Sequence, residues 1–416
     1  MQMRQIVKGG SFPTTAVDRA LVWLLLATVF SQYTGLLPEP IDTLSIVCAF
    51  ALVPAYYLIR SNFTLRVPLE TTALVGAITL LFGFHLLTGH YSNLEYGLLP
   101  VYTSVVVIAG LVFLPQLVDS ETLLTHVAIF GALVGLFGAL VWATGTGDAF
   151  HMFSHANKRS IFNDPNTLGL LAFVGFVGSL GAFSRTRSRR AAGLVVANLV
   201  FVGITVSRGV WLAVAAALCV LALDALFSRR IAAAAVSAGV LTTAAVTALV
   251  VTLPVETTLF LPLTNRQYLW QATVEATYEA GLFTGAGFYM PGPHIRPFVE
   301  FELEAGKSLG PHNSYLLVFF YGGVVGLVLY LHLLWGTIAR AFRDPRVDVL
   351  LVALAVGFGA NLFFEGYSFW SVGMHGVLLT LAFGALAWES TNRVVVVDVR
   401  NLTSFRISRR NRSPGL

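Results

Sequence analysis

His312 is the residue whose surroundings best suit acid–base chemistry. It follows Pro311, which is favoured at the first position of a helix, so the pattern predicts that its imidazole lies in the first turn of a long apolar helix. The positive end of a helix dipole disfavours a second positive charge, and a general base must be neutral. A structural role is the alternative, and it is the more frequent one for a single histidine at such a position.

Two arginines are candidates of a similar kind. Arg208 lies in Ser207-Arg208-Gly209, the whole expected connection between two apolar segments, and Arg266 opens a polar segment further along the chain. Ionisable groups kept at the edge of an apolar layer often mark a functional site. The simpler interpretations are that Arg208 extends to the interface from a helix end and that Arg266 is a solvated loop charge.

Three further features have weaker signals. Gly285-Ala286-Gly287 could offer backbone amides to a phosphate group, although two glycines in a loop are common. Asn163-Asp164-Pro165-Asn166 is typical of a turn followed by a helix start. Glu365 could orient one of the arginines, or it could mark the water boundary at the end of an apolar segment.

A metal site has little support in the sequence. His151 and His155 are spaced four residues apart with Asp148 and Asp164 nearby, which permits metal binding. No accompanying pattern of residues that would orient such ligands is present, so we expect no metal.

The composition shows what must position these residues. Of 416 residues, 56% are hydrophobic and 11% are charged, and the mean hydropathy is +0.76. A soluble globular chain carries about 25% charged residues, so a soluble fold is excluded. The apolar residues form blocks of about 20, the length that spans a bilayer, and only helices or closed barrels satisfy their own backbone there. Because the blocks are too long and uniform for barrel strands, the sequence predicts an all-α integral membrane protein.

About 12 transmembrane helices are expected. The predicted spans are 17–37, 41–60, 70–89, 97–118, 121–145, 166–184, 191–206, 209–227, 231–253, 313–336, 347–365 and 373–391. With both termini in the cytoplasm, most of the 26 Lys and Arg residues fall on the inner side, as the positive-inside rule requires. The cations left on the outer side are Lys158, Arg159, Arg208, Arg266, Arg296 and Lys307.

This arrangement divides the chain into tails, a membrane domain and two long outer loops. The tail 1–16 and the basic tail 392–416 are cytoplasmic, and the membrane domain is 17–391, with outer loops at 146–165 and 254–312. Within the second tail, we expect Arg406–Arg412 to be a solvated anchor that faces membrane lipids. Nucleic-acid binding is not expected, because no aromatic platform or recognition helix accompanies the positive charges.

The loop 254–312 contains an expected interfacial amphipathic helix. Thr264 with Gln267 three residues later fits a capping box. The helix that follows would carry a polar stripe and an adjacent apolar stripe, an arrangement suited to the membrane surface. The polar stripe is Gln267, Gln271, Glu275 and Glu279, and the apolar one is Trp270, Val274 and Tyr278.

Taken in order, these motifs resemble the O-antigen ligase/polymerase family over roughly residues 155–370. The resemblance depends on the following segments: Phe162-Asn163-Asp164-Pro165-Asn166, Ser207-Arg208-Gly209-Val210-Trp211-Leu212, Arg266 followed by Gly285-Ala286-Gly287, and Pro311-His312-Asn313-Ser314-Tyr315-Leu316 with Gly322–Gly326. The first 150 residues match only in hydrophobicity, so the sequence does not separate ligase from polymerase.

The resemblance implies a metal-independent glycosyltransferase without a cofactor, at the outer face of the cytoplasmic (inner) membrane and with its active site facing the periplasm or exterior. The donor would be a glycan on a polyprenyl (undecaprenyl) pyrophosphate, and the acceptor a hydroxyl of lipid-A-core, another glycan or a protein. The implied catalytic residues are His312 as base and Arg208 and Arg266 as a pyrophosphate clamp. The other implied substrate-binding residues are Gly285, Gly287, Asn313, Asn166, Arg159 and Glu365.

Three interpretations stay open. Within the family, the chain is either a ligase or a polymerase, with transfer to a protein hydroxyl as a variant. A transporter is the alternative from another class, since 12 spans are common among transporters. Against transport, the chain lacks an evident internal repeat and has few ionisable residues at the middle of its spans.

Overall fold

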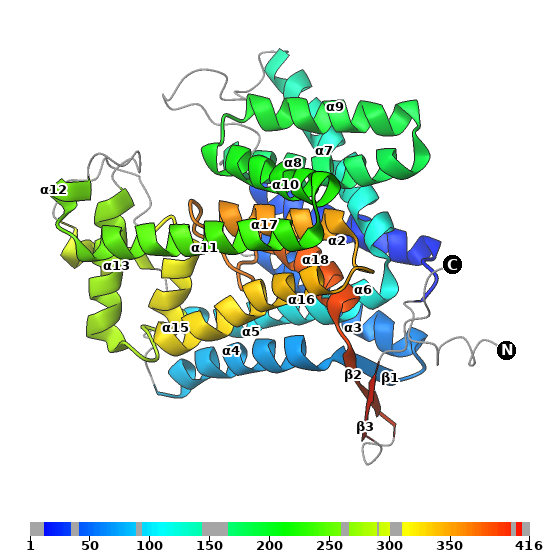
Figure 1. The fold of residues 1–416 in the computed structure, drawn as a ribbon. Helices are drawn as coiled ribbons and strands as arrows, with labels where there is room; N and C mark the ends of the chain where they lie inside the picture. The colour runs from blue at the N-terminus through cyan, green and yellow to red at the C-terminus, as the bar shows by residue number, and fades with distance from the viewer. Residues whose placement is uncertain are drawn as a thin grey trace.

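The computed structural model describes residues 12–34, 41–88, 94–143, 165–258, 266–288, 291–299, 310–400 and 405–409. Most of these residues are helical, which confirms the predicted class of helical membrane protein (Figure 1). The first half contains α2 (Ala16–Thr34), α3 (Ile41–Arg60), α4 (Leu69–Leu87), α5 (Leu94–Ile108), a π-helical turn (Ala109–Phe113), α6 (Leu114–Leu117), α7 (Ser120–Ala143), α8 (Pro165–Thr186) and α9 (Arg189–Ile204). The second half contains α10 (Arg208–Leu226), α11 (Arg229–Thr252), α12 (Val255–Thr258), α13 (Arg266–Gly281), α14 (Pro291–Ile295), α15 (Ser314–Leu331), a second π-helical turn (His332–Gly336), α16 (Thr337–Arg343), α17 (Val349–Asn361) and α18 (Met374–Ser390).

Within the described residues, each of the twelve predicted spans lies mainly on one helix or on consecutive helices, and the span 313–336 contains the break of α15 at Gly323. Among the described residues, eight helices are long and apolar enough to cross a membrane, and α17 is a shorter apolar helix. The helical segments are therefore confirmed, while the number of spans and their sidedness stay predictions.

Side-chain caps explain where several helices begin. Ser188, Ser207 and Ser228 accept hydrogen bonds from backbone amides in the first turns of α9, α10 and α11, and Asp348 does the same for α17. Such caps satisfy amides that have no partner inside the helix. The short polar connections between apolar blocks thus fix the first residue of each following helix.

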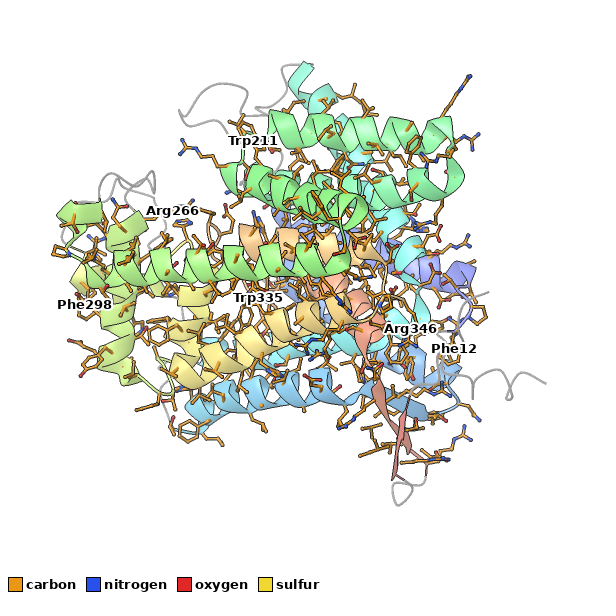
Figure 2. All side chains as sticks on the ribbon, viewed as in Figure 1. Phe12, Trp211, Arg266, Phe298, Trp335 and Arg346 are labelled. Carbon is orange, nitrogen blue, oxygen red and sulfur yellow. The ribbon has the colours of Figure 1, made fainter. Side chains whose placement is uncertain are left out.

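The helices form one bundle whose two ends differ (Figure 1). At one end, α13 runs across the bundle instead of along it, close to α12; we call this the outer end. The opposite, inner end carries a small sheet. Figure 2 shows Arg266 and Trp211 at the outer end and Arg346 at the inner end.

The inner end is linked by ion pairs and hydrogen bonds, some of them buried and some exposed. Arg60 pairs with the fully buried Asp18, and Arg185 contacts Glu121 at 2.9 Å. Arg229 donates at 3.0 Å to each of the Val347 and Ala341 carbonyls. These cations all belong to the group that the charge bias assigns to the cytoplasmic side.

A three-stranded antiparallel sheet in the order β1-β2-β3 was not predicted from the sequence. It joins β1 (Thr64–Pro68), β2 (Arg393–Asp398) and β3 (Phe405–Arg409). The strands within 392–416 are therefore new, while Arg406 in β3 is exposed, and its contact with membrane lipids stays a prediction. The run of four valines at 394–397 has the branched side chains that favour strands, and β1 supplies the pairing partner.

The helix expected in the loop 254–312 is present as α13, but its faces differ from the prediction. Gln267 is buried and Tyr278 is 71% exposed; Thr264 lies outside the described residues. The buried side contains Leu269, Trp270, Ala272, Thr273, Ala276 and Thr277. The helix packs against α15 and α11, so protein contacts, not a polar and an apolar face, decide which residues are covered.

α15 is broken near its middle, and a loop segment fills the break. Gly323 has a positive φ of 59°. The amides of Ala286 and Gly287 donate to the carbonyls of Phe320 (2.7 Å) and Tyr321 (3.0 Å), and the amides of Val324 and Val325 donate to the carbonyls of Leu282 (2.9 Å) and Phe283 (3.1 Å). Backbone groups freed at membrane depth must find partners inside the protein, and the segment 282–287 supplies them.

Candidate functional site

The residues after α17 bring the three predicted catalytic residues together. We call residues 361–367 the α17 connection. Arg266 donates through Nη1 to the carbonyl of Phe364. The backbone of His312 lies 3.6 Å from the point where a Cβ on Gly366 would stand. Arg208 is followed by Gly209. A Cβ on Gly209 would lie 3.0 Å from the Asn361 Nδ2 and 3.4 Å from the Glu365 Oε1, two atoms of the same connection.

Arg208 is the first residue of α10, not part of a turn as predicted. Ser207 is the cap, and its side chain accepts from the amide of Val210 at 3.4 Å. Val206, just before the cap, has a φ of +51°, a conformation that is strained for a branched residue. Such strain persists where surrounding contacts hold it and is common at functional sites. One turn into the helix, the Trp211 indole donates to the Val202 carbonyl at 3.1 Å and fixes the entry to α10.

Arg266 is the first residue of α13, and its guanidinium is partly desolvated. Burial lowers the pKa of Arg266 below its usual value, the negative charge of Glu365 raises it, and the positive charge of Arg208 lowers it further. These interactions require that the two cations and the carboxylate lie near one another. The cluster therefore holds an excess of positive charge in a poorly hydrated place, which suits binding of an anion.

His312 lies outside the helix that was expected to contain it. α15 begins at Ser314, and Asn313 is the cap, with its Oδ1 accepting from the amides of Tyr315 (3.0 Å) and Leu316 (3.1 Å). His312 itself has a φ of +44°, which costs energy for a residue with a side chain. The sequence suggested Pro311 as the helix start, but the capping ability of Asn313 is stronger.

Two hydrogen bonds hold His312 in this strained conformation. The indole of Trp270 on α13 donates to the Pro311 carbonyl at 2.9 Å, and the amide of Ser314 donates to the Leu362 carbonyl at 2.8 Å. The hydroxyl of Ser314 also donates to the Glu365 carbonyl at 2.6 Å. His312 is thus fixed between α13 and the α17 connection, the two elements that carry Arg266 and Glu365.

The phosphate-binding role expected for Gly285 and Gly287 does not agree with the structure. The amide of Gly285 donates to the Gly281 carbonyl at 2.7 Å, and that of Gly287 is used at the α15 break. A Cβ on Gly285 would lie 2.5 Å from the amide nitrogen of Gly323. Gly285 allows two backbones to cross closely, and because both amides already donate to carbonyls, they are not available to a phosphate.

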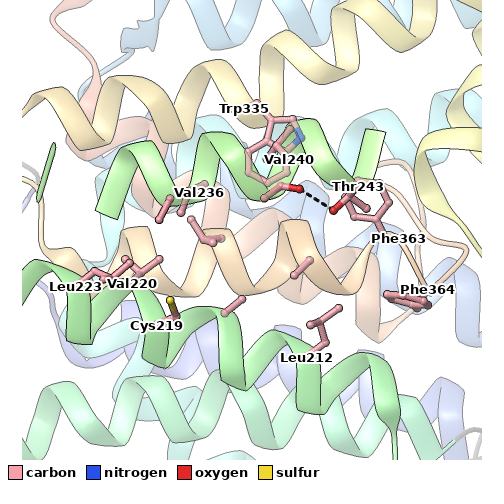
Figure 3. A pocket seen from close by; sticks show the side chains of 15 residues that line it. Leu212, Cys219, Val220, Leu223, Val236, Val240, Thr243, Trp335, Phe363 and Phe364 are labelled. Carbon is pink, nitrogen blue, oxygen red and sulfur yellow. Dashed lines mark hydrogen bonds between the residues drawn. The ribbon is translucent and has the colours of Figure 1, made fainter. Parts of the chain in front are cut away.

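An apolar cleft of about 360 Å³ opens beside the cluster (Figure 3). Its walls come from α10, α11, α17 and the π-helical turn before α16. The lining residues are Leu212, Ala216, Cys219, Val220, Leu223, Ala235, Val236, Gly239, Val240, Thr243, Trp335, Val356, Ala360, Phe363 and Phe364. Phe364, whose carbonyl accepts from Arg266, stands at one end, and Leu212 lies one turn after Arg208. The cleft therefore leads from the apolar interior to the charged cluster.

The remaining predicted site residues have different positions. Asn166 lies in the first turn of α8; Gly169, one turn later, packs against Thr205 and Val210 near the start of α10. Arg159 lies outside the described residues, as do the histidines and aspartates of the weak metal pattern. Among the residues that are described, no three His, Cys, Asp or Glu side chains gather as metal ligands would.

Sequence reasoning missed Asn361 and Tyr367 in the α17 connection. The Tyr367 phenol donates to the Asn361 Oδ1 at 2.7 Å, and burial raises the pKa of Tyr367 well above its usual value, so it keeps this proton. An asparagine at the end of an apolar span was an available signal, but its neighbours in space are far apart in sequence. Only the fold places it next to Gly209, the residue after Arg208.

Comparison with known families gives a match to part of the chain. Residues 192–331 match the family described as O-antigen ligase, a region that includes Arg208, Arg266 and His312 and ends before the α17 connection. This finding confirms, over that region, the resemblance to the family that the sequence motifs indicated. Comparison with curated proteins finds no match.

Proposed function

We propose that this chain, which carries an O-antigen ligase-family domain at residues 192–331, transfers a glycan from a polyprenyl pyrophosphate to an acceptor hydroxyl at the outer face of the cytoplasmic membrane. The family supports a membrane glycosyltransferase of the O-antigen ligase/polymerase type in general. The observation that supports the finer proposal is that Arg208, Arg266 and His312 lie around the α17 connection, whose Phe364 also lines an apolar cleft.

The two arginines would bind the pyrophosphate. Guanidinium groups pair with phosphate oxygens through parallel hydrogen bonds, and a desolvated cation stabilises the charge that builds on the leaving group. Because Arg208 and Arg266 come from the starts of α10 and α13, they could hold the pyrophosphate from two sides.

His312 would act as general base. The acceptor oxygen attacks the anomeric carbon and forms the new glycosidic bond, while the bond from that carbon to the pyrophosphate oxygen breaks and its electron pair leaves with polyprenyl pyrophosphate. The imidazole takes the proton of the acceptor hydroxyl. No metal is needed for this sequence, since the arginines neutralise the leaving group.

The apolar cleft would hold part of the polyprenyl chain. Along α10 it extends from Leu212 to Leu223, roughly 17 Å at about 1.5 Å per residue. α11 forms one wall of the cleft, and only 6% of the apolar window of α11 is buried in the protein, compared with 78% for α8. A lightly packed wall helix suits entry of a lipid chain from the side.

The acceptor distinguishes the alternatives within the family. A ligase would use lipid-A-core, a polymerase a second lipid-linked glycan, and a third variant a protein hydroxyl. We propose the ligase; the family match supports ligase and polymerase alike, so the choice of acceptor is what distinguishes them.

A reconstituted assay tests this proposal. The purified protein in vesicles is given a polyprenyl-pyrophosphate glycan and, separately, lipid, glycan and peptide acceptors, and the product is separated by mass. We expect transfer to one acceptor class, and loss of transfer in Arg266→Ala. A protein that binds no donor and transfers to no acceptor, but moves a solute across the vesicle membrane, would instead be a transporter.

A further inference from the structure

Glu365 creates a conflict within the proposed anion site. This residue is 8% exposed, and its negative charge acts on the partly buried Arg266 guanidinium. A pyrophosphate that binds Arg208 and Arg266 would bring further negative charge to the same place, where poor hydration makes like charges repel strongly. The carboxylate must therefore either leave the arginines or weaken donor binding.

Asn361 has an unused donor next to that carboxylate. Its side chain is 1% exposed, and its Nδ2 has no hydrogen-bond partner among the described residues. Nδ2 and the Glu365 Oε1 lie 3.0 Å and 3.4 Å from one point, the position where a Cβ on Gly209 would stand. The two groups thus border the same small space at the start of α10, which the absence of a side chain on Gly209 leaves open.

The Tyr367 hydroxyl fixes which end of the amide faces this space. It donates to Oδ1 at 2.7 Å, so the NH₂ end must point away from the phenol. A buried amide donor without a partner costs about 1–3 kcal/mol, and such a cost calls for a partner in another state of the protein. A carboxylate is the strongest acceptor available for it.

We propose that Glu365 is a displaceable counter-ion: it neutralises the arginines in the empty site, and on donor binding it moves to the Asn361 Nδ2. The pyrophosphate takes its place between Arg208 and Arg266. Asn361 is then a positioning residue that never touches the substrate, and Glu365 competes with the donor. This inference rests on the proposed function, because it requires that the arginines bind the donor's pyrophosphate.

A double-mutant cycle on donor binding tests the exchange. Affinity for the polyprenyl-pyrophosphate glycan is measured for wild type, Asn361→Leu, Glu365→Gln and the double variant. We expect Asn361→Leu to weaken binding about tenfold or more, the loss that follows removal of a hydrogen bond to a charged group. Glu365→Gln should tighten binding, and in that background Asn361→Leu should change affinity less than about threefold.

The controls separate this exchange from loss of structure and from failure of the proposed function. Asn198→Leu removes another fully buried amide, on α9, and should leave donor affinity unchanged; Tyr367→Phe should weaken binding in the same direction as Asn361→Leu. Equal losses from Asn361→Leu with and without Glu365, or weaker binding in Glu365→Gln, would overturn the exchange. If Arg208→Ala and Arg266→Ala do not weaken donor binding, the proposed function itself fails.

Discussion

At the outer end, we expect the crossing of the segment 282–287 with the broken α15 to tolerate substitution least. Gly285 has a φ of +73°, and a Cβ there would lie 2.5 Å from the Gly323 nitrogen and 2.6 Å from the Phe320 carbonyl oxygen. Both neighbours are backbone atoms that cannot turn aside. Gly285→Ala must therefore separate the two segments.

The cost has two parts. A side chain in the left-handed region costs about 1–2 kcal/mol. Separation also breaks the bonds from Ala286 to Phe320 and from Gly287 to Tyr321, and each buried group left without a partner costs about 1–3 kcal/mol. With partial relaxation, we expect a total destabilisation of about 3–6 kcal/mol, from the same two sources.

Gly193→Ala is the matched control. A Cβ at this position on α9 would meet nothing within 4 Å, and alanine in a helix interior is favoured over glycine by about 0.5–1 kcal/mol. The assay is the fraction of protein that stays monodisperse after heating in detergent. Gly285→Ala should lose its folded fraction at a clearly lower temperature, and equal survival of both variants would refute the close crossing.

Three further predictions follow from the site and the topology. Arg208→Lys should lower transfer at least about tenfold, about 1.4 kcal/mol, because lysine cannot make the paired contact; full activity would mean that the arginine only extends to the interface. Val240→Trp should fill the cleft and weaken binding of a long-chain donor at least about tenfold, whereas Leu241→Trp, on the 71% exposed neighbour, should not; equal effects would exclude the cleft as the chain's site. With Cys48 and Cys219 replaced, a cysteine at the exposed Pro293 should react with an impermeant thiol reagent in spheroplasts and one at Thr186 should not, and the reverse labelling would invert the orientation.

The sequence was sufficient for the helices because the apolar blocks are long and uniform. It was not sufficient for the sheet, since β1 and β2 are separated by more than 300 residues and pairing between them is a long-range event that local propensity does not reveal. The pattern of residue types also gave a wrong prediction of which face of α13 is buried. Contacts with α15 and α11 bury Thr273 and Thr277, and a stripe of residue types cannot show which neighbours a helix will have.

For the site, residue type and order predicted the convergence of Arg208, Arg266 and Glu365 better than they predicted local geometry. His312 was placed in a helix because Pro311 precedes it, yet Asn313 caps the helix and leaves His312 with a left-handed backbone. The sequence predicts a phosphate-binding role for Gly285 and Gly287 because a glycine can offer its amide to a ligand, but a glycine also allows two backbones to cross closely, and only the fold distinguishes these two uses.

The central claim is that Arg266 binds the donor while His312 carries out the proton transfer, and one experiment separates the two. Donor affinity and the single-turnover rate are measured side by side for wild type, Arg266→Ala, His312→Ala and, as a control histidine of the outer loop, His294→Ala. We expect His312→Ala to lose about 10²–10⁴ in rate at nearly unchanged donor affinity, Arg266→Ala to weaken donor binding, and His294→Ala to resemble wild type. Wild-type turnover in His312→Ala, or unchanged donor affinity in Arg266→Ala, would contradict the account.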